Sequence, residues 1–274
     1  MSGVVLTIRE PAGPPIDMTG VLPERLAEGG RKALAGLTLV RGRGRHRLDA
    51  LFTFQDGGPP GTLILRPGGA VLDGVGTGMT AGDIGVEGDC GAYAASAMRG
   101  GTLTIEGSCG AFAAAGMAGG SLRVAGDAGD FLGAPLAGGT RGMSGGSVVV
   151  MGDAGDRVGE RMRRGLIAVH GRVGSLCGAR MIAGTIVVGA GCGPDPGQAM
   201  RRGSILLPRA PEPVPSGFSD GGMNDWLFLE LVRKELIDGG AWPSGFPTAG
   251  TRARRLIGDR SAGGIGEVLI LSEA

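Results

Sequence analysis

Cysteine and histidine could act here as nucleophiles, bases or metal ligands, so their spacing is the first test for chemistry. The chain has four cysteines: Cys90, Cys109, Cys177 and Cys192. No two of them have the C-x-x-C spacing of zinc or iron–sulfur sites. The two histidines, His46 and His170, form no local zinc motif and lie in no nucleophile elbow or triad signature. We therefore expect no catalytic residue, no metal site and no cofactor bound by this chain.

Arginine provides a candidate binding surface. The pairs Arg163/Arg164 and Arg201/Arg202 recur at the same position of a 19-residue repeat, two repeats apart. They should project from one flank, roughly 10 Å from each other. One interpretation is a solvated flank that makes contacts between subunits. The other is a clamp for a polyanionic substrate tail or a partner's acidic edge, since guanidinium groups bind carboxylate and phosphate groups well.

The aspartates and glycines favour structural roles. Asp89, Asp127 and Asp153 recur at one corner of the repeat and are typical turn formers. The glycine-rich stretch 74–78 is not followed by a helical pattern, so it fits a corner better than a dinucleotide-binding loop. Three cysteines also share one repeat position, which alanine and valine occupy in other copies, and this favours small core residues.

The elements that position these residues come from the 19-residue repeat, which is built on methionine and glycine. Seven methionines lie on one grid, with a single longer interval after the third: Met79, Met98, Met117, Met143, Met162, Met181 and Met200. Three residues after each lies a glycine: Gly82, Gly101, Gly120, Gly146, Gly165, Gly184 and Gly203. Apolar residues follow two and four positions later, which predicts one short strand per repeat with one buried face.

A strand every 19 residues leaves no room for a crossover helix, so each strand must stack on the next copy. We therefore predict an all-β fold, a right-handed parallel β-helix with 19-residue coils. The longer interval predicts a loop, 135–141, at one corner. An earlier, degenerate coil carries Gly61, Leu63 and Leu65.

The flanking sequence predicts three parts: a small N-terminal cap (1–57), the parallel β-helix (58–208) and a linker, helix and docking tail (209–274). An uncapped β-helix end would be an open sheet edge, hence the cap. In the C-terminal extension, apolar residues at helical spacing predict one helix over 225–236 with Asp225 as N-cap. The tail is expected to cover the last coil or to dock on a neighbour.

Composition narrows the classes of function. The formal net charge is +1, which argues against nucleic acid and anionic membranes as partners. There is no apolar run of membrane-spanning length and no signal-peptide pattern at the start, so we expect a cytoplasmic protein with reduced thiols. The 59 glycines follow no three-residue period, which excludes collagen.

The repeat M-x-G-G-x-I-x-V-x-G-x-x-G, seen in 117–129 and 143–155, resembles a known family. It is similar to the β-helix shared by the gamma subunit of formylmethanofuran dehydrogenase and the C-terminal domain of the glutamate synthase large subunit. The segment Asp49–Phe52, the insert ending at Arg141-Gly142-Met143 and the total length favour the first relative. The arginine-rich composition is typical of a GC-rich bacterium, which points to the formyltransferase/hydrolase complex of methylotrophs.

This resemblance implies a non-catalytic structural subunit in one-carbon metabolism. In that family the complex converts formyl-tetrahydromethanopterin to formate through a methanofuran-type carrier. The expected partners are an amidohydrolase-like subunit, a formyltransferase subunit and a further dehydrogenase-like subunit, which would hold the carrier and the metal. Two alternatives remain: a glutamate-synthase-like β-helix module, and a stand-alone anion-binding module that uses the arginine flank.

Overall fold

The protein is rich in β-structure, and strands far outnumber helices. The computed structural model describes residues 3–240, 242–243, 246, 250 and 252–271. The described helices are α1 (Pro23–Ala35), α2 (Leu48–Leu51), α3 (Phe228–Asp238) and the 3-10 helix η1 (Arg260–Ala262). The described strands are β1 (Val4–Ile8), β2 (Ile16–Asp17), β3 (Thr38–Arg41), β4 (Gly44–Arg47), β5 (Phe52–Asp56), β6 (Thr62–Arg66), β7 (Leu72–Asp73), β8 (Asp83–Val86), β9 (Arg99–Ile105), β10 (Gly119–Val124), β11 (Ser144–Val150), β12 (Arg164–Val169), β13 (Arg172–Val173), β14 (Thr185–Val188), β15 (Gly191–Cys192), β16 (Ser204–Leu207), β17 (Ser219–Asp225), β18 (Arg252–Gly258) and β19 (Gly266–Ile270).

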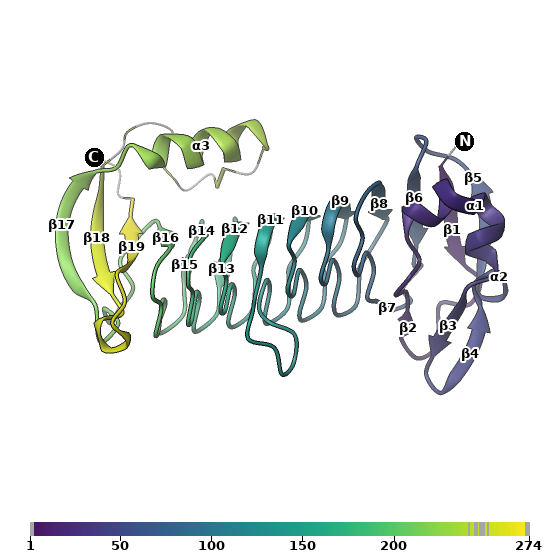
Figure 1. Cartoon of the computed structure of the whole chain (residues 1–274), viewed down its shortest axis with the longest axis horizontal. Helices are drawn as coiled ribbons and strands as arrows, with labels where there is room; N and C mark the ends of the chain where they lie inside the picture. Colours follow the sequence, from purple (N-terminus) through teal and green to yellow (C-terminus); the bar gives the residue numbers. More distant parts are fainter. Residues whose placement is uncertain (1–2, 241, 244–245, 247–249, 251, 272–274) are drawn as a thin grey trace.

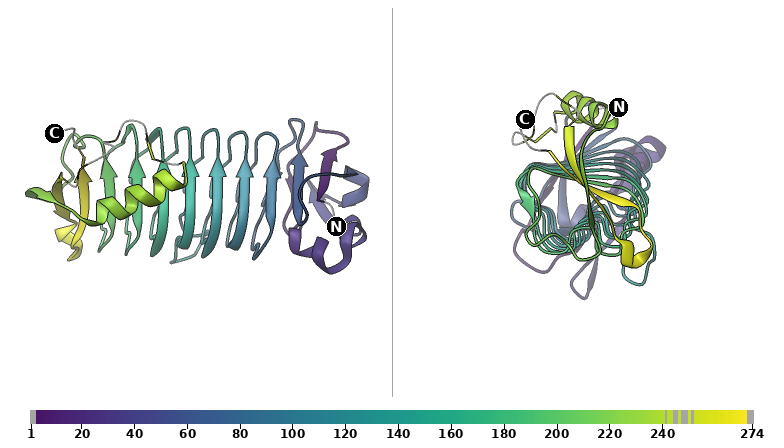
Figure 2. Two further views of the ribbon diagram at one scale, coloured as in Figure 1. Left: turned by 90° about the horizontal axis from the view of Figure 1, so that it is seen from above. Right: turned by 90° about the vertical axis from the view of Figure 1, so that its left-hand side faces the viewer.

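Equivalent strands of successive repeats lie side by side in one long sheet. Within the described residues it has 13 strands, in the order β17-β18-β19-β16-β14-β12-β11-β10-β9-β8-β6-β1-β5. From β6 to β16 neighbouring strands are parallel and in repeat register, for example Ile84 against Leu103. Figure 1 shows the resulting row of stacked coils, and the end view in Figure 2 shows the chain winding round a common interior. The predicted strand of each repeat is confirmed, including β6 in the degenerate coil.

Each methionine of the repeat packs against the glycine of the following coil. All seven methionine side chains are fully buried. A Cβ on Gly120 would lie 2.7 Å from Cε of Met98, and a Cβ on Gly146 would lie 2.9 Å from Cε of Met117. These glycines also have positive φ, so both the space and the backbone conformation exclude a side chain. The recurring methionine and glycine of the M-x-x-G pattern therefore serve contacts between coils, in which the methionine of one coil packs against the glycine of the next.

A second line of contacts joins the corners of the coils. Isolated parallel bridges link Cys90 to Cys109 and continue through the same repeat position to Val173. Carboxylates reinforce this line: Oδ1 of Asp127 accepts the N–H of Asp153, and Oδ1 of Asp153 accepts the N–H of Arg172, at 2.8 and 2.7 Å. The aspartates interpreted as turn formers thus also bond to the next coil.

The N-terminal end of the stack is completed by α1. In later coils, the residue that follows the repeat methionine donates its backbone N–H to the carbonyl oxygen of the repeat methionine in the preceding coil. Arg99, for example, donates to Met79 at 2.8 Å. For Thr80 that acceptor is Oε1 of Glu24, at 2.5 Å, which also accepts from the Thr80 hydroxyl and the Ala81 N–H. Burial raises the pKa of Glu24, but these hydrogen bonds outweigh it and the pKa lies below its usual value.

At the C-terminal end of the stack, a side-chain carboxylate also takes the place of a backbone acceptor. Residues preceding the repeat methionines donate to the next coil, as Arg180 does to the carbonyl of Gln198. For Ala199 the acceptor is instead Oδ2 of Asp259, at 3.0 Å. Asp259 is buried, which raises its pKa, yet hydrogen bonds from Ser261 and Ala199 bring the pKa below its usual value. At each end, one carboxylate thus supplies an acceptor that the backbone of the adjoining segment does not.

Among the described residues, the N-terminal segment adds the five strands β1 to β5 and the two helices α1 and α2. Strand β1 extends the sheet parallel to β6, and β5 follows antiparallel at the edge. The helix α1 was not anticipated from the sequence. It begins with Pro23 at its first turn, buries Leu26 and Leu34, and is kinked at Gly30, whose φ is 62°.

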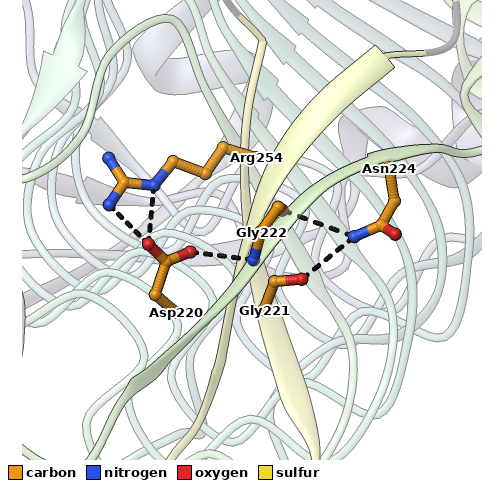
Figure 3. A network of polar contacts seen from close by, with 5 residues as sticks. All are labelled: Asp220, Gly221, Gly222, Asn224 and Arg254. Atoms are coloured by element: carbon orange, nitrogen blue, oxygen red, sulfur yellow. Dashed lines mark hydrogen bonds and ion pairs between the residues drawn. The ribbon is translucent and has the colours of Figure 1, made fainter.

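The C-terminal segment folds back on the stack. Strand β19 is parallel to β16, so the tail covers the last coil. Strands β17 and β18 form an antiparallel ribbon at this end, in which Arg254 pairs with Asp220 at 2.7 Å (Figure 3). The prediction that Asp225 caps the helix is wrong. Asp225 pairs with Arg252 in this ribbon, and α3 begins at Phe228 after Leu227.

The helix α3 lies across the outer face of the later strands (Figure 2). Positions expected to be polar or small and solvent-facing are apolar and buried there, with Leu206 and Val187 both at 0% exposure. They pack with Leu229 and Leu236 of α3 in a second apolar cluster. The repeat strands β11, β12, β14 and β16 are therefore buried on both faces, and the predicted alternation is wrong for them.

Replacing Gly120 with alanine should destabilise the stack by about 3 kcal/mol, lowering Tm by roughly 5–10 °C. The new Cβ would lie 2.7 Å from both Cε of Met98 and the carbonyl oxygen of Gly101. Gly116→Ala is the matched control, because Gly116 also has positive φ but no atom within 4 Å of a Cβ, and Ala97 occupies the same repeat position. Its cost should be about 1 kcal/mol. Thermal unfolding of both variants measures the difference; equal losses would contradict the interlocking contact.

Replacing Glu24 with glutamine should destabilise the protein more at pH 7 than at pH 3. A carboxylate whose pKa is depressed by folding stabilises fully above its unfolded pKa of about 4.5, and this contribution disappears as pH falls through the folded pKa. Urea unfolding of wild type and variant at both pH values tests this. Glu28→Gln, at an exposed position of the same helix, is the control and should show little effect at either pH.

Candidate functional site

The four predicted arginines line one groove on the later coils. Arg163, Arg164, Arg201 and Arg202 surround a volume of about 670 Å³ together with Ser144, Ile182 and Ala183. Each arginine pair directly follows a repeat methionine, so the repeat register places the pairs on the same flank. Ile182 and Ala183 hold the equivalent positions in the coil between them. The groove thus has the uncharged Ile182 and Ala183 between two arginine pairs.

A second groove of about 450 Å³ adjoins the first. It shares Arg163, Ile182 and Arg201, and adds Arg161 and Arg180 among its lining residues. These two arginines directly precede Met162 and Met181, so the repeat would have identified them if that position had been compared between coils. They were missed because only adjacent arginine pairs stand out in the sequence.

One buried carboxylate neutralises part of this arginine surface. Glu160 is only 8% exposed and lies 3.0 Å from Arg180 and 3.9 Å from Arg161. It also pairs with Arg157 at 3.2 Å. The positive charge of these three arginines is therefore partly compensated, and their guanidinium groups are held in position.

The four predicted arginines have no such compensation. None of them forms an ion pair with a carboxylate among the described residues. Arg164, Arg201 and Arg202 are exposed, and Arg163 is half-buried. Nε of Arg163 is buried without a hydrogen-bond acceptor in the described part of the chain. This arrangement suits carboxylate or phosphate oxygens, because guanidinium groups donate paired, charge-assisted hydrogen bonds to them.

The cysteines are in positions unsuited to nucleophilic chemistry. Cys90, Cys109 and Cys177 are buried, and Cys192 is half-buried. Burial raises the pKa of Cys109 to about 12 and that of Cys192 to about 11, and raises the pKa of each of the other two as well. Since the thiolate is the reactive form, these groups are poor nucleophiles near neutral pH.

The remaining candidate groups are dispersed. His46 is exposed on β4, and His170 is half-buried after β12. The described residues contain no group of three or more histidine, cysteine or acidic side chains placed to hold a metal ion. Likewise, no described helix has the length and apolar composition needed to cross a membrane.

Comparison with known proteins identifies a relative of the whole chain. No family model and no curated protein matches the sequence. Among solved structures, it is similar to a chain of the formyltransferase/hydrolase complex (FhcABCD) from Methylorubrum extorquens, crystallised in complex with methylofuran. The identity is 31% and the TM-score is 0.87. The alignment covers 98% of this chain and 100% of that chain, so both terminal segments are shared as well as the coils.

Proposed function

This chain belongs to the family of a subunit of the formyltransferase/hydrolase complex, and we propose that it is the structural, gamma-type subunit of such a complex. The observation that carries the proposal is the end-to-end match with a chain of that complex at 31% identity. As a member of this family, the chain is a component of a hetero-oligomer.

The proposed role is non-catalytic. The residues that the repeat retains most strictly, the seven methionines and their glycines, are committed to contacts between coils. The cysteines are committed to the interior, with raised pKa values. In this proposal an amidohydrolase-like subunit and a formyltransferase subunit perform the chemistry, beside a further dehydrogenase-like subunit. They convert formyl-tetrahydromethanopterin to formate through a methanofuran-type carrier in the cytoplasm, and they hold the carrier and the metal.

The proposed architecture is a right-handed parallel β-helix. Support comes from the parallel register of β6 to β16 and from the separate corner line that links Cys90 to Val173. Two such lines on different sides of the coil are expected when a chain winds repeatedly round one axis. A rigid stack of this kind offers partner chains a long surface whose side chains are fixed relative to one another.

Within this role, the arginine groove is proposed to hold an anionic segment. Support comes from the two uncompensated pairs, Arg163/Arg164 and Arg201/Arg202, on either side of Ile182 and Ala183. A polyanionic tail of the carrier, or an acidic edge of a partner, would place carboxylate groups between them. The same feature would serve a stand-alone anion-binding module, so the two functions differ in whether partners are required.

Purification of the tagged chain from its native host should recover an amidohydrolase-like and a formyltransferase chain in constant stoichiometry. Mass spectrometry identifies the partners. The recovered complex should release formate from formyl-tetrahydromethanopterin, while the isolated chain should not, because the proposed catalytic groups lie in the partners. A stable lone monomer would support the stand-alone module, and flavin or iron–sulfur partners would support a glutamate-synthase-like module. Either result contradicts the proposal.

The double variant Arg163→Gln/Arg201→Gln should bind a fluorescent deca-aspartate probe roughly tenfold or more weakly than wild type. Each lost guanidinium removes charge-assisted hydrogen bonds, worth about 1.5–3 kcal/mol in favourable geometry. Fluorescence anisotropy at low salt measures binding, and thermal unfolding checks the fold. The control is Arg99→Gln/Arg45→Gln, which removes the same charge at exposed positions outside the groove; Arg99 also directly follows a repeat methionine. Equal weakening in both variants would mean that the groove is not a specific site.

A further inference from the structure

Three aromatic side chains form a ladder along one corner of the coils. Tyr93, Phe112 and Phe131 occupy the same repeat position in successive coils. Their rings are stacked, with centroids 5.3 and 4.7 Å apart and interplanar angles of 12° and 2°. Tyr93 is 39% exposed, and the two phenylalanines are half-buried. We call these three residues the aromatic ladder.

The backbone at this corner does not favour aromatic residues. Tyr93, Phe112 and Phe131 have φ values of 63°, 61° and 63°, in the left-handed region that glycine adopts most easily. Gly74 holds the equivalent position in the preceding coil. Arg157 and Leu176 adopt the same conformation at this repeat position in later coils, so the corner itself does not require aromatic residues.

Two rows of exposed carboxylates lie four positions and one position before the aromatic ladder in the repeat. One row contains Asp89, Asp127 and Asp153, and the other contains Asp130 and Asp156. Each uses Oδ1 to accept a hydrogen bond from the next coil, as Asp89 does from Ser108. Within the described residues none of the five forms an ion pair. The edge is therefore both aromatic and acidic.

One end of the aromatic ladder already carries a cation. The guanidinium carbon of Arg157, at the same repeat position in the next coil, lies 5.9 Å from the ring centroid of Phe131. At the other end, Tyr93 follows Gly74, which contributes no side chain to the stack. A Cβ on Gly74 would meet the Thr19 hydroxyl oxygen at 2.8 Å and Oδ1 of Asp17 at 3.3 Å. The surroundings of this end are thus polar and acidic.

We infer that the aromatic ladder and its carboxylate rows form a docking surface for an arginine- or lysine-bearing segment of a partner subunit. A cation over Tyr93 would repeat the contact that Arg157 makes with Phe131, and cation–π attraction is largest where the ring is shielded from water. The carboxylate rows supply the complementary charge along the same edge, which favours correctly oriented encounters. This surface is distinct from the arginine groove, and the inference shares with the proposed function only the requirement for partner chains.

Site-specific photo-crosslinking in the assembled complex tests the inference. The photoreactive amino acid p-benzoylphenylalanine at position 93 retains an aromatic ring there. After irradiation, the cross-linked peptide should come from another subunit and contain arginine or lysine. Size-exclusion chromatography establishes assembly independently. A complex that assembles without such a cross-link, or with a peptide that lacks basic residues, overturns the inference while the proposed function stands. If the chain does not assemble, both fail.

A charge variant provides a second readout. Asp89→Asn/Asp127→Asn/Asp153→Asn keeps the Oδ1 acceptors and removes three charges, so the unfolding temperature should change little. Partner affinity should fall roughly tenfold at low salt, and the difference should shrink at high salt. Tyr93→Asn/Phe112→Asn should likewise weaken assembly without loss of stability, because asparagine tolerates positive φ. Leu176→Asn is the control, at the same repeat position with φ of 62° but outside the aromatic ladder. Unchanged affinity in both test variants overturns the inference.

Discussion

The contact between each repeat methionine and the glycine of the next coil is the constraint on which the structure depends. It requires a flexible apolar side chain on one coil and bare backbone on the other, and it recurs from Met79 to the pair Met181 and Gly203. Because neighbouring coils are held at this separation, backbone hydrogen bonds form in register along two sides of the stack. A core with few aromatic residues can then be closely packed, since small and β-branched side chains meet their own equivalents.

The same regularity creates a problem at both ends, where the adjoining strands β6 and β19 extend the sheet but their segments do not supply every backbone acceptor. The chain solves it with carboxylates, because one anion can accept hydrogen bonds from several N–H groups that would otherwise lack acceptors. Glu24 does so for Thr80 and Ala81, and Asp259 does so for Ala199. Each carboxylate comes from a flanking segment, which explains why a chain built from repeats has non-repetitive ends.

The strands and the common flank of the arginine pairs could be predicted because each depends on spacing within the repeat. The same holds for the insert, whose residues 136–141 are exposed and lie outside any strand. The role of α3 could not, since Leu206 and Val187 show only that a second face is apolar, and nothing local identifies what covers it. Asp225 was misassigned because an acidic residue before an apolar run is also compatible with a strand end. The aromatic ladder required knowledge of ring stacking and of positive φ, which sequence spacing does not supply.

The two carboxylate ends have a consequence for how such proteins vary in length. The hydrogen bonds of Glu24 and Asp259 do not depend on the number of coils between them, because each carboxylate contacts only the coil beside it. Whole repeats can therefore be gained or lost in evolution without redesign of either end. Each such event would change the distance between the two ends by one inter-strand spacing, about 4.8 Å. The length of such a stack would therefore change in steps that each correspond to one 19-residue repeat.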